Sequence, residues 1–237
     1  MAYKLLKKFE DTFHGQKYLH RNANLGNRIA DYLYEDLYDV GLSRKFVYRV
    51  NDGTRVLNPK NKTAGIKARR GDGSFGDIVP GFPPQREGGF AVPRGPTANV
   101  EIGTEVKIIA KAMIKQIDRV MNDLCNQAKH FQRHSSSALT IGIVGVNHAQ
   151  HYTSFEGRRS YRTTGKGGYL HPIQEAEETK ARLISQAKPC FFEFVILEFD
   201  AMNEKPYPFK WTNATRTEEE YGAMLVRIAR EYDVRFP

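Results

Sequence analysis

The run ALTIGIVGV, residues 138–146, is apolar at almost every position. A half-solvated strand alternates apolar and polar residues, so a continuous run predicts a strand covered on both faces. The patterns around it predict helices at 111–131, 171–187 and 217–232 and another strand at 190–199. Strands that alternate with helices favour an α/β fold with a mixed central β-sheet flanked by helices.

The first half of the chain predicts a further helix and a hairpin. Leu25, Ile29, Leu33 and Leu37 recur at the helical period, and Gly41 is a natural stop. Asn-Asp-Gly at 51–53 joins two β-prone runs, which predicts a β-hairpin over 46–56. No linker separates two cores. We therefore expect one domain, 1–237, with a core at about 25–149 and a C-terminal extension, a further strand and helix, at about 170–237.

Composition and charge limit the classes of partner that the chain can be expected to bind. The formal net charge is +9 over 237 residues, which favours a polyanion such as nucleic acid or an anionic membrane surface. No long apolar run occurs, and the start MAYKLLKKFE is too polar for a secretory signal, so a cytoplasmic protein without a membrane segment is expected. Cys125 and Cys190 lack CxxC partners, so neither a zinc site nor a disulfide partner is expected.

A charged strand face carries the candidate chemistry. In VEIGTEVKII, residues 100–109, strand alternation places Glu101, Glu105 and Lys107 on one face. Burying three such charges without partners would be prohibitive, so this face should meet water or a ligand, while the other packs on the following helix. If residues 75–79 form the neighbouring strand, Asp77 can converge with Glu105. Two adjacent carboxylates suit Mg²⁺. Asp72 competes for the same role, although Gly-Asp-Gly is typical of a turn.

Asp77 followed by Glu105-Val106-Lys107 resembles the motif of the PD-(D/E)xK nuclease superfamily, which includes type II restriction endonucleases. The order of elements over 25–149 is similar to that superfamily's αβββαβ core. The resemblance implies that Asp77, Glu105 and the Val106 backbone carbonyl bind Mg²⁺, which Mn²⁺ can replace, and that Lys107 handles the attacking water. Two features depart from the family: Gly76 stands where it has proline, and 28 residues separate the two acids.

The resemblance also implies supporting residues. An acid on the first helix often joins the metal site in the family; Glu35 is the first candidate, with Asp31 and Asp36 as alternatives. Gln116 would brace the site from the following helix. Glu101 is expected to be a bystander.

The remaining candidate binding residues are cations and histidines. Basic loops around the site are expected to bind nucleic acid through Lys60, Lys62, Lys67, Arg69, Arg70, Arg86, Arg94, Arg158, Arg159, Arg162 and Lys166. His148 and His151 follow the apolar strand, where a phosphate contact is possible. No third ligand at a matching spacing accompanies them, so a polar loop is favoured over a metal site.

Together these features predict a Mg²⁺-dependent DNA endonuclease of a restriction system, a phosphodiester hydrolase that acts on duplex DNA and can form a homodimer on two-fold symmetric sites. The alternatives are a catalytically inactive nucleic-acid-binding module on the same fold and an RNA nuclease.

Overall fold

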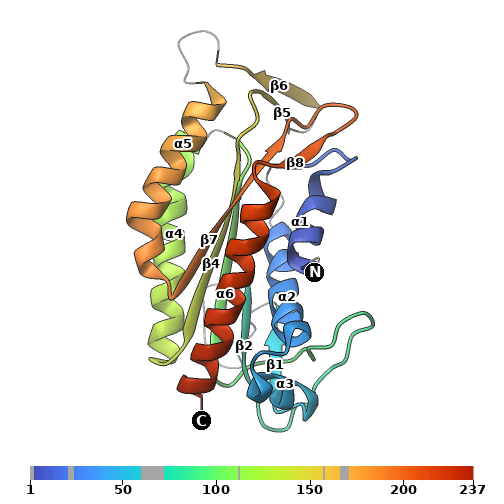
Figure 1. The fold of residues 1–237 in the computed structure, drawn as a ribbon, viewed down its shortest axis with the longest axis vertical. Coiled ribbons are helices and arrows are strands. Elements are labelled where there is room, and N and C mark those ends of the chain that lie inside the picture. The colour runs from blue at the N-terminus through green and yellow to red at the C-terminus, as the bar shows by residue number, and fades with distance from the viewer. Residues whose placement is uncertain are drawn as a thin grey trace.

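The apolar run 138–146 forms a central strand of the sheet. A computed structural model describes residues 3–20, 24–59, 72–111, 113–156, 158–165 and 171–236. In it, β4 (Leu139–Asn147) is buried at every position and lies inside a six-stranded mixed sheet flanked by helices, an α/β fold (Figure 1). The strand order is β1 (Arg55–Asn58), β2 (Gly73–Asp77), β3 (Ile102–Ile109), β4, β7 (Glu193–Ala201) and β8 (Phe209–Trp211).

The two halves of this sheet differ in strand direction. β1, β2 and β3 pair antiparallel, β3, β4 and β7 pair parallel, and β8 returns antiparallel to β7. The crossover from β3 to β4 runs through α4 (Met113–His134). From α2 (Asn24–Val40) to β4, the order of helix, three antiparallel strands, helix and parallel strand is the one expected from the sequence, apart from an additional helix, α3 (Arg44–Asn51), before β1.

Helices cover both faces of the sheet (Figure 1). α1 (Lys4–Phe13), α2 and α6 (Ala214–Arg235) share one core with Ile102 and Val106 of β3. α4, α5 (Pro172–Arg182) and the irregular turns η1 (Leu183–Ala187) and η2 (Lys188–Cys190) share the other with Ile109 and Val144. The apolar face of β3 therefore packs on α2, and its Glu105–Lys107 face lies on the α4 side. We had expected the apolar face to pack on the following helix, α4, so that expectation was wrong.

The expected hairpin over 46–56 is wrong. Residues Arg44–Asn51 form a helix, α3, whose first turn is capped by Ser43: its Oγ accepts a hydrogen bond from the Phe46 amide at 2.9 Å. Phe46 and Val50, four residues apart, are the buried positions, which is helical spacing. Asn-Asp-Gly follows the helix, with Gly53 at φ +73°, and β1 pairs with β2 instead of with residues 46–50.

The cysteines correct a second expectation. Cys125 of α4 and Cys190 of η2 form a disulfide across 65 residues, although neither has a nearby cysteine in sequence. The long separation hides the pairing, because only the packing of α4 against the turns after α5 brings the two residues together. Across the described residues, no helix combines the length and the apolar character that crossing a membrane requires.

A small ribbon extends from the end of β4. β5 (Tyr152–Glu156) and β6 (Arg159–Thr163) pair antiparallel and form a separate two-stranded sheet, seen above the main sheet in Figure 1.

Candidate active site

The candidate site lies where the pairing between β2 and β3 ends. β3 pairs with β4 along its whole length, but with β2 only from Ile102 to Thr104. Asp72 directly precedes β2 and stands opposite Glu105 when the register is extended by one residue. Its Oδ2 accepts a hydrogen bond from the Val106 amide at 2.8 Å. A carboxylate therefore satisfies the β3 backbone at the point where the β2 ladder stops.

This geometry contradicts the expected convergence of Asp77 with Glu105. In an antiparallel pair the numbers of opposing residues have a constant sum, so the residue opposite Glu105 is 72 and not 77. Asp77 lies five residues further along β2, about 17 Å from Asp72. There it forms an ion pair with Arg55 of β1, Oδ1 to Nη1 at 2.8 Å. Asp72, for which the sequence pattern predicted a turn, is the acid that lies beside Glu105-Val106-Lys107.

Glu105 and Lys107 are partners on the same face of β3. Lys107 Nζ donates a short hydrogen bond to Glu105 Oε1. The Glu105 side chain is 5 % exposed and that of Lys107 is 31 % exposed, so the ammonium is the part of the pair that reaches the surface. Glu105 Oε2 is buried and has no hydrogen-bond partner among the described residues. A buried carboxylate oxygen without a partner is costly, so this oxygen could act as a ligand for a cation.

The charges of the site perturb one another. Burial raises the pKa of Glu105 to about 7, with a further push from Asp72 and an opposing pull from Lys107. Burial also raises the pKa of Asp72, against the effect of Lys107 and of the Val106 amide. For Lys107, burial lowers the pKa, but Glu105, Asp72 and Asp123 together raise it above its ordinary value. The lysine is thus held as an ammonium beside two carboxyls that resist being charged together.

Two helices frame these groups. A Cβ at Gly26, in the first turn of α2, would lie 2.8 Å from Asp72 Oδ1, so a larger residue there would displace the Asp72 carboxylate from its present position. The positive end of the α2 dipole favours an anion at this position. On the other side, Phe131 of α4 covers Gly103 of β3, so the earlier part of α4, with Asp123, lies toward Lys107.

The expected supporting residues have hydrogen-bond partners elsewhere. Gln116 is exposed, and its Nε2 donates to the Lys111 carbonyl at 3.0 Å. Glu35 lies nine residues after Gly26, about 14 Å along the helix, where it accepts the backbone amides of Ala91 and Val92 at 2.8 and 3.0 Å. Glu35 therefore holds a loop, and its expected role as a metal ligand has no support in the geometry.

The alternative first-helix acids are also engaged elsewhere. Asp36 accepts hydrogen bonds from the Lys4 and Leu5 amides and from the Tyr221 hydroxyl. Asp31 faces Arg94 at 3.7 Å, and burial raises its pKa to about 6.

The predicted nucleic-acid-binding cations divide into three groups. Lys60, Lys62, Lys67, Arg69, Arg70 and Lys166 lie outside the described residues. Arg94 is only 6 % exposed and faces Asp31, so it is not available at the surface as we expected. Arg86, Arg158, Arg159 and Arg162 are exposed.

Glu101 is not a neighbour of Glu105 in space. Its carboxylate accepts from Arg55 Nε at 2.8 Å and from the Tyr232 hydroxyl, and Arg49 lies 3.5 Å away. These partners come from β1, α6 and α3, so Glu101 points away from the α4 side. Its expected place on the Glu105 face was wrong, because the strand alternation does not extend beyond Ile102, where β3 begins.

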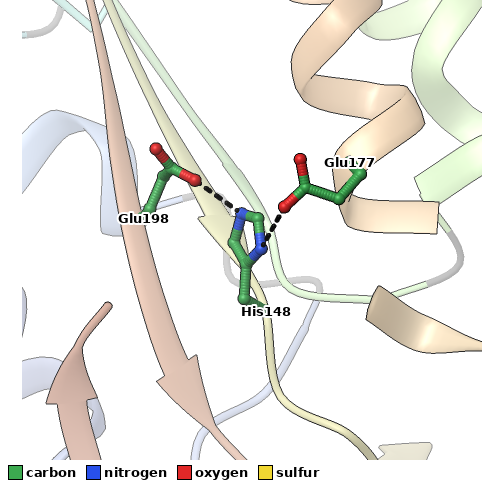
Figure 2. Close-up of side chains that lie close together, drawn as sticks. All are labelled: His148, Glu177 and Glu198. Carbon is green, nitrogen blue, oxygen red and sulfur yellow. Dashed lines mark ion pairs between the residues drawn. The ribbon is translucent and has the colours of Figure 1, made fainter. Parts of the chain in front are cut away.

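A second charged cluster, which the sequence did not predict, surrounds His148 just after β4 (Figure 2). His148 Nε2 lies 3.1 Å from Glu198 Oε2 of β7, and Nδ1 lies 3.4 Å from Glu177 Oε1 of α5. Lys180 Nζ also contacts Glu198 at 2.9 Å. The contacts with His148 and with Lys180, against the effect of burial, lower the pKa of Glu198 to about 2.

This cluster has the residue types of a metal site but a poor arrangement for one. The two carboxylates lie at opposite nitrogens of one ring (Figure 2), and one ion can contact only one ring nitrogen. Lys180 already supplies a cation to Glu198. We therefore rank it below the Asp72–Glu105–Lys107 site. Its three members come from three separate elements, so no sequence spacing could reveal it.

Comparison of the chain with protein-family models, with curated proteins and with solved structures finds no match to any of them.

Proposed function

We propose that the chain is a divalent-metal-dependent nuclease that hydrolyses phosphodiester bonds in DNA, with Asp72, Glu105 and Lys107 as its active site. One observation carries the proposal: the buried Glu105 carboxyl, the half-buried Asp72 carboxyl and the Lys107 ammonium meet where the β2–β3 ladder ends, and a Glu105 oxygen there lacks a hydrogen-bond partner among the described residues. The order of elements and the acid-x-lysine on β3 support the resemblance to PD-(D/E)xK nucleases, with Asp72 in place of Asp77.

The donor set fits Mg²⁺ or Mn²⁺. Asp72 and Glu105 offer the carboxylate oxygens that hard cations prefer, and the Val106 carbonyl is a candidate backbone ligand. When bound there, such an ion would supply Lewis acidity to the phosphate and lower the pKa of a coordinated water. The upward pKa shifts of both carboxyls also favour this reading, because a cation would offset the burial that raises both and the repulsion from Asp72 that adds to the shift of Glu105.

Lys107 contributes its charge. Because neighbouring carboxyls raise its pKa, the side chain is an ammonium and acts as a hydrogen-bond donor. Its partial exposure lets it reach a phosphate oxygen or an attacking water beside Glu105. A fixed ammonium next to the scissile phosphate stabilises the negative charge that develops in the transition state.

Two aspartates at the two ends of β2 provide the test. Asp72→Asn should abolish cleavage of duplex DNA in Mg²⁺ and weaken Mn²⁺ binding in calorimetry, because it removes a negative ligand. Asp77→Asn makes the same chemical change about 17 Å away on β2 and should leave both properties intact. EDTA should stop wild-type cleavage. Equal effects of the two substitutions, or cleavage that survives EDTA, would overturn the proposal.

Parallel assays on single-stranded DNA and on RNA identify the substrate. A chain that binds nucleic acid but cuts none of these substrates with Mg²⁺ or Mn²⁺ would instead be an inactive binding module.

A further inference from the structure

The β5–β6 ribbon has one anchored strand and one open strand. In β5, Tyr152 is 1 % exposed, the Thr153 amide donates to the Met202 carbonyl at 2.9 Å, and Asn203 Nδ2 donates to the Thr153 carbonyl at 2.9 Å. In β6, residues 159–162 are all exposed. Among the described residues, no strand other than β5 pairs with β6. The ribbon is therefore held rigidly along β5 and presents β6 as its outer edge.

Cations stand on both faces of that edge. Side chains alternate along a strand, so Arg159 and Tyr161 share one face of β6 while Arg162 lies on the other. Arg162 forms an ion pair with Glu204, Nε to Oε1 at 3.1 Å, but its side chain is 57 % exposed. Such surface pairs contribute little, so the guanidinium can exchange the carboxylate for a phosphate.

We propose that the β6 edge enters the major groove of duplex DNA, with Arg159 and Arg162 on the phosphates of opposite groove walls. This inference rests on the proposed nuclease function and specifies how its duplex is held. A β-layer with its side chains is about 10 Å thick. The major groove is about 12 Å wide and the minor groove about 6 Å, so only the major groove admits the ribbon edge-on.

The position of the ribbon is compatible with a duplex that also reaches the active site. Glu105 is opposite Gly142 of β4, and β4 ends five residues later at Asn147, about 17 Å along the sheet. That is about half a turn of B-DNA. The ribbon begins shortly afterwards, at Tyr152. A second copy of the chain is disfavoured as the occupant, because pairing two β6 edges would bring two sets of arginines together.

Binding measured without divalent metal separates this inference from catalysis. We would titrate the full chain with a 20-base-pair DNA duplex in EDTA over a series of salt concentrations. Arg159→Ala/Arg162→Ala should weaken binding about tenfold and reduce the slope of log K against log[salt] by about 2, one for each lost phosphate contact. Arg133→Ala/Arg230→Ala is the matched control, since both residues are exposed and lie on α4 and α6 rather than on the ribbon. It should leave affinity and slope unchanged.

Glu204→Gln tests the sign of the effect. The substitution removes the negative charge beside Arg162 but keeps a side-chain oxygen that can accept a hydrogen bond from the Thr153 hydroxyl. In the wild type, this bond joins Thr153 Oγ1 and Glu204 Oε1 at 2.6 Å. Duplex affinity should rise by about twofold to fivefold.

Three outcomes would overturn the ribbon's role: a wild-type chain that does not bind the duplex, a double variant that binds as tightly as wild type, or an equal loss of affinity for an RNA duplex, whose major groove is too deep and narrow for the ribbon. Thermal unfolding of each variant checks that the fold is retained. Ribbon-dependent duplex binding without cleavage in Mg²⁺ would instead overturn the nuclease proposal alone.

Discussion

Two groups of acids and cations lie at opposite ends of the same pair of strands, β2 and β3. At one end, Glu101 and Asp77 meet Arg55 at 2.8 Å each, and Tyr232 and Arg49 complete the shell of Glu101. At the other end, the described residues give Asp72 and Glu105 one shared cation, the Lys107 ammonium, and leave one Glu105 oxygen without a hydrogen-bond partner.

The difference shows what separates a structural ion cluster from a candidate site. Glu101 is 3 % exposed and Glu105 is 5 % exposed, so burial alone does not distinguish them. Their partners do. Glu101 has two guanidinium groups and a hydroxyl, whereas Glu105 has one ammonium among the described residues, and burial together with a second carboxyl raises its pKa. A fully satisfied charge stabilises the fold, and an incompletely satisfied one leaves room for a ligand.

Lys107→Ala should give the largest effect on activity. Removing a fixed donor at the developing charge costs about 10²- to 10³-fold in cleavage rate, or about 3–4 kcal/mol. The fold should persist, because the neighbouring carboxyls can take up a proton when the ammonium is lost. The measurement is single-turnover cleavage of duplex DNA in Mg²⁺, and Lys129→Ala, on the exposed face of α4, is the control. Full activity of Lys107→Ala would refute the role given to the lysine.

Arg55→Ala should give the largest effect on stability. It leaves Glu101 buried with Arg49 at 3.5 Å as its nearest remaining cation, and breaking a buried pair in this way costs about 3 kcal/mol. Urea unfolding measures the loss. Cleavage per folded molecule should be unchanged, because Asp77 and Glu101 do not contact the active site. A folded Arg55→Ala chain that has lost cleavage would contradict the division into two clusters.

The fold could be predicted from patterns that are local in sequence, and the errors in that prediction came from the same local patterns. The apolar run 138–146 and the alternation of helices and strands around it correctly indicated an α/β sheet with helices on both faces. Residues 46–50 were taken for a strand because apolar residues at four-residue spacing fit both periods in so short a segment.

The site was predicted only in part, for a different reason. Glu105 and Lys107 could be paired from strand alternation alone. Which acid lies opposite Glu105 depends on the register between β2 and β3. The connecting residues 78–101 determine that register, and no local sequence pattern reveals it. A register that differs by five residues exchanges Asp77 for Asp72. The disulfide and the His148 cluster depend on packing between distant elements in the same way.

The pH dependence of stability should separate the two clusters next. The pKa of Glu105 is raised from 4.5 to about 7, so between these values the folded chain binds more protons than the unfolded chain. The free energy of unfolding of the metal-free protein should therefore fall as pH rises through this window, by on the order of 2 kcal/mol. Glu105→Gln should remove most of this slope in urea unfolding with EDTA.

Glu101→Gln is the control for that measurement. It lies in the satisfied cluster and should lower stability while it keeps the slope of wild type. A Glu105→Gln variant with the wild-type slope would show that the acid does not carry the buried charge we assign to it.

The smallest effect is expected at His148, whose cluster resembles the Glu101 end in its ion pairs, although His148 Nε2, like Glu105 Oε2, lacks a hydrogen-bond partner among the described residues. Each of its nitrogens already faces a carboxylate, and Lys180 also pairs with Glu198. His148→Gln should therefore leave the Mn²⁺ affinity and the number of bound ions unchanged in calorimetry, whereas Asp72→Asn reduces them. Loss of one bound ion in His148→Gln would show that charge satisfaction fails as a criterion here and would make the His148 cluster a second metal site.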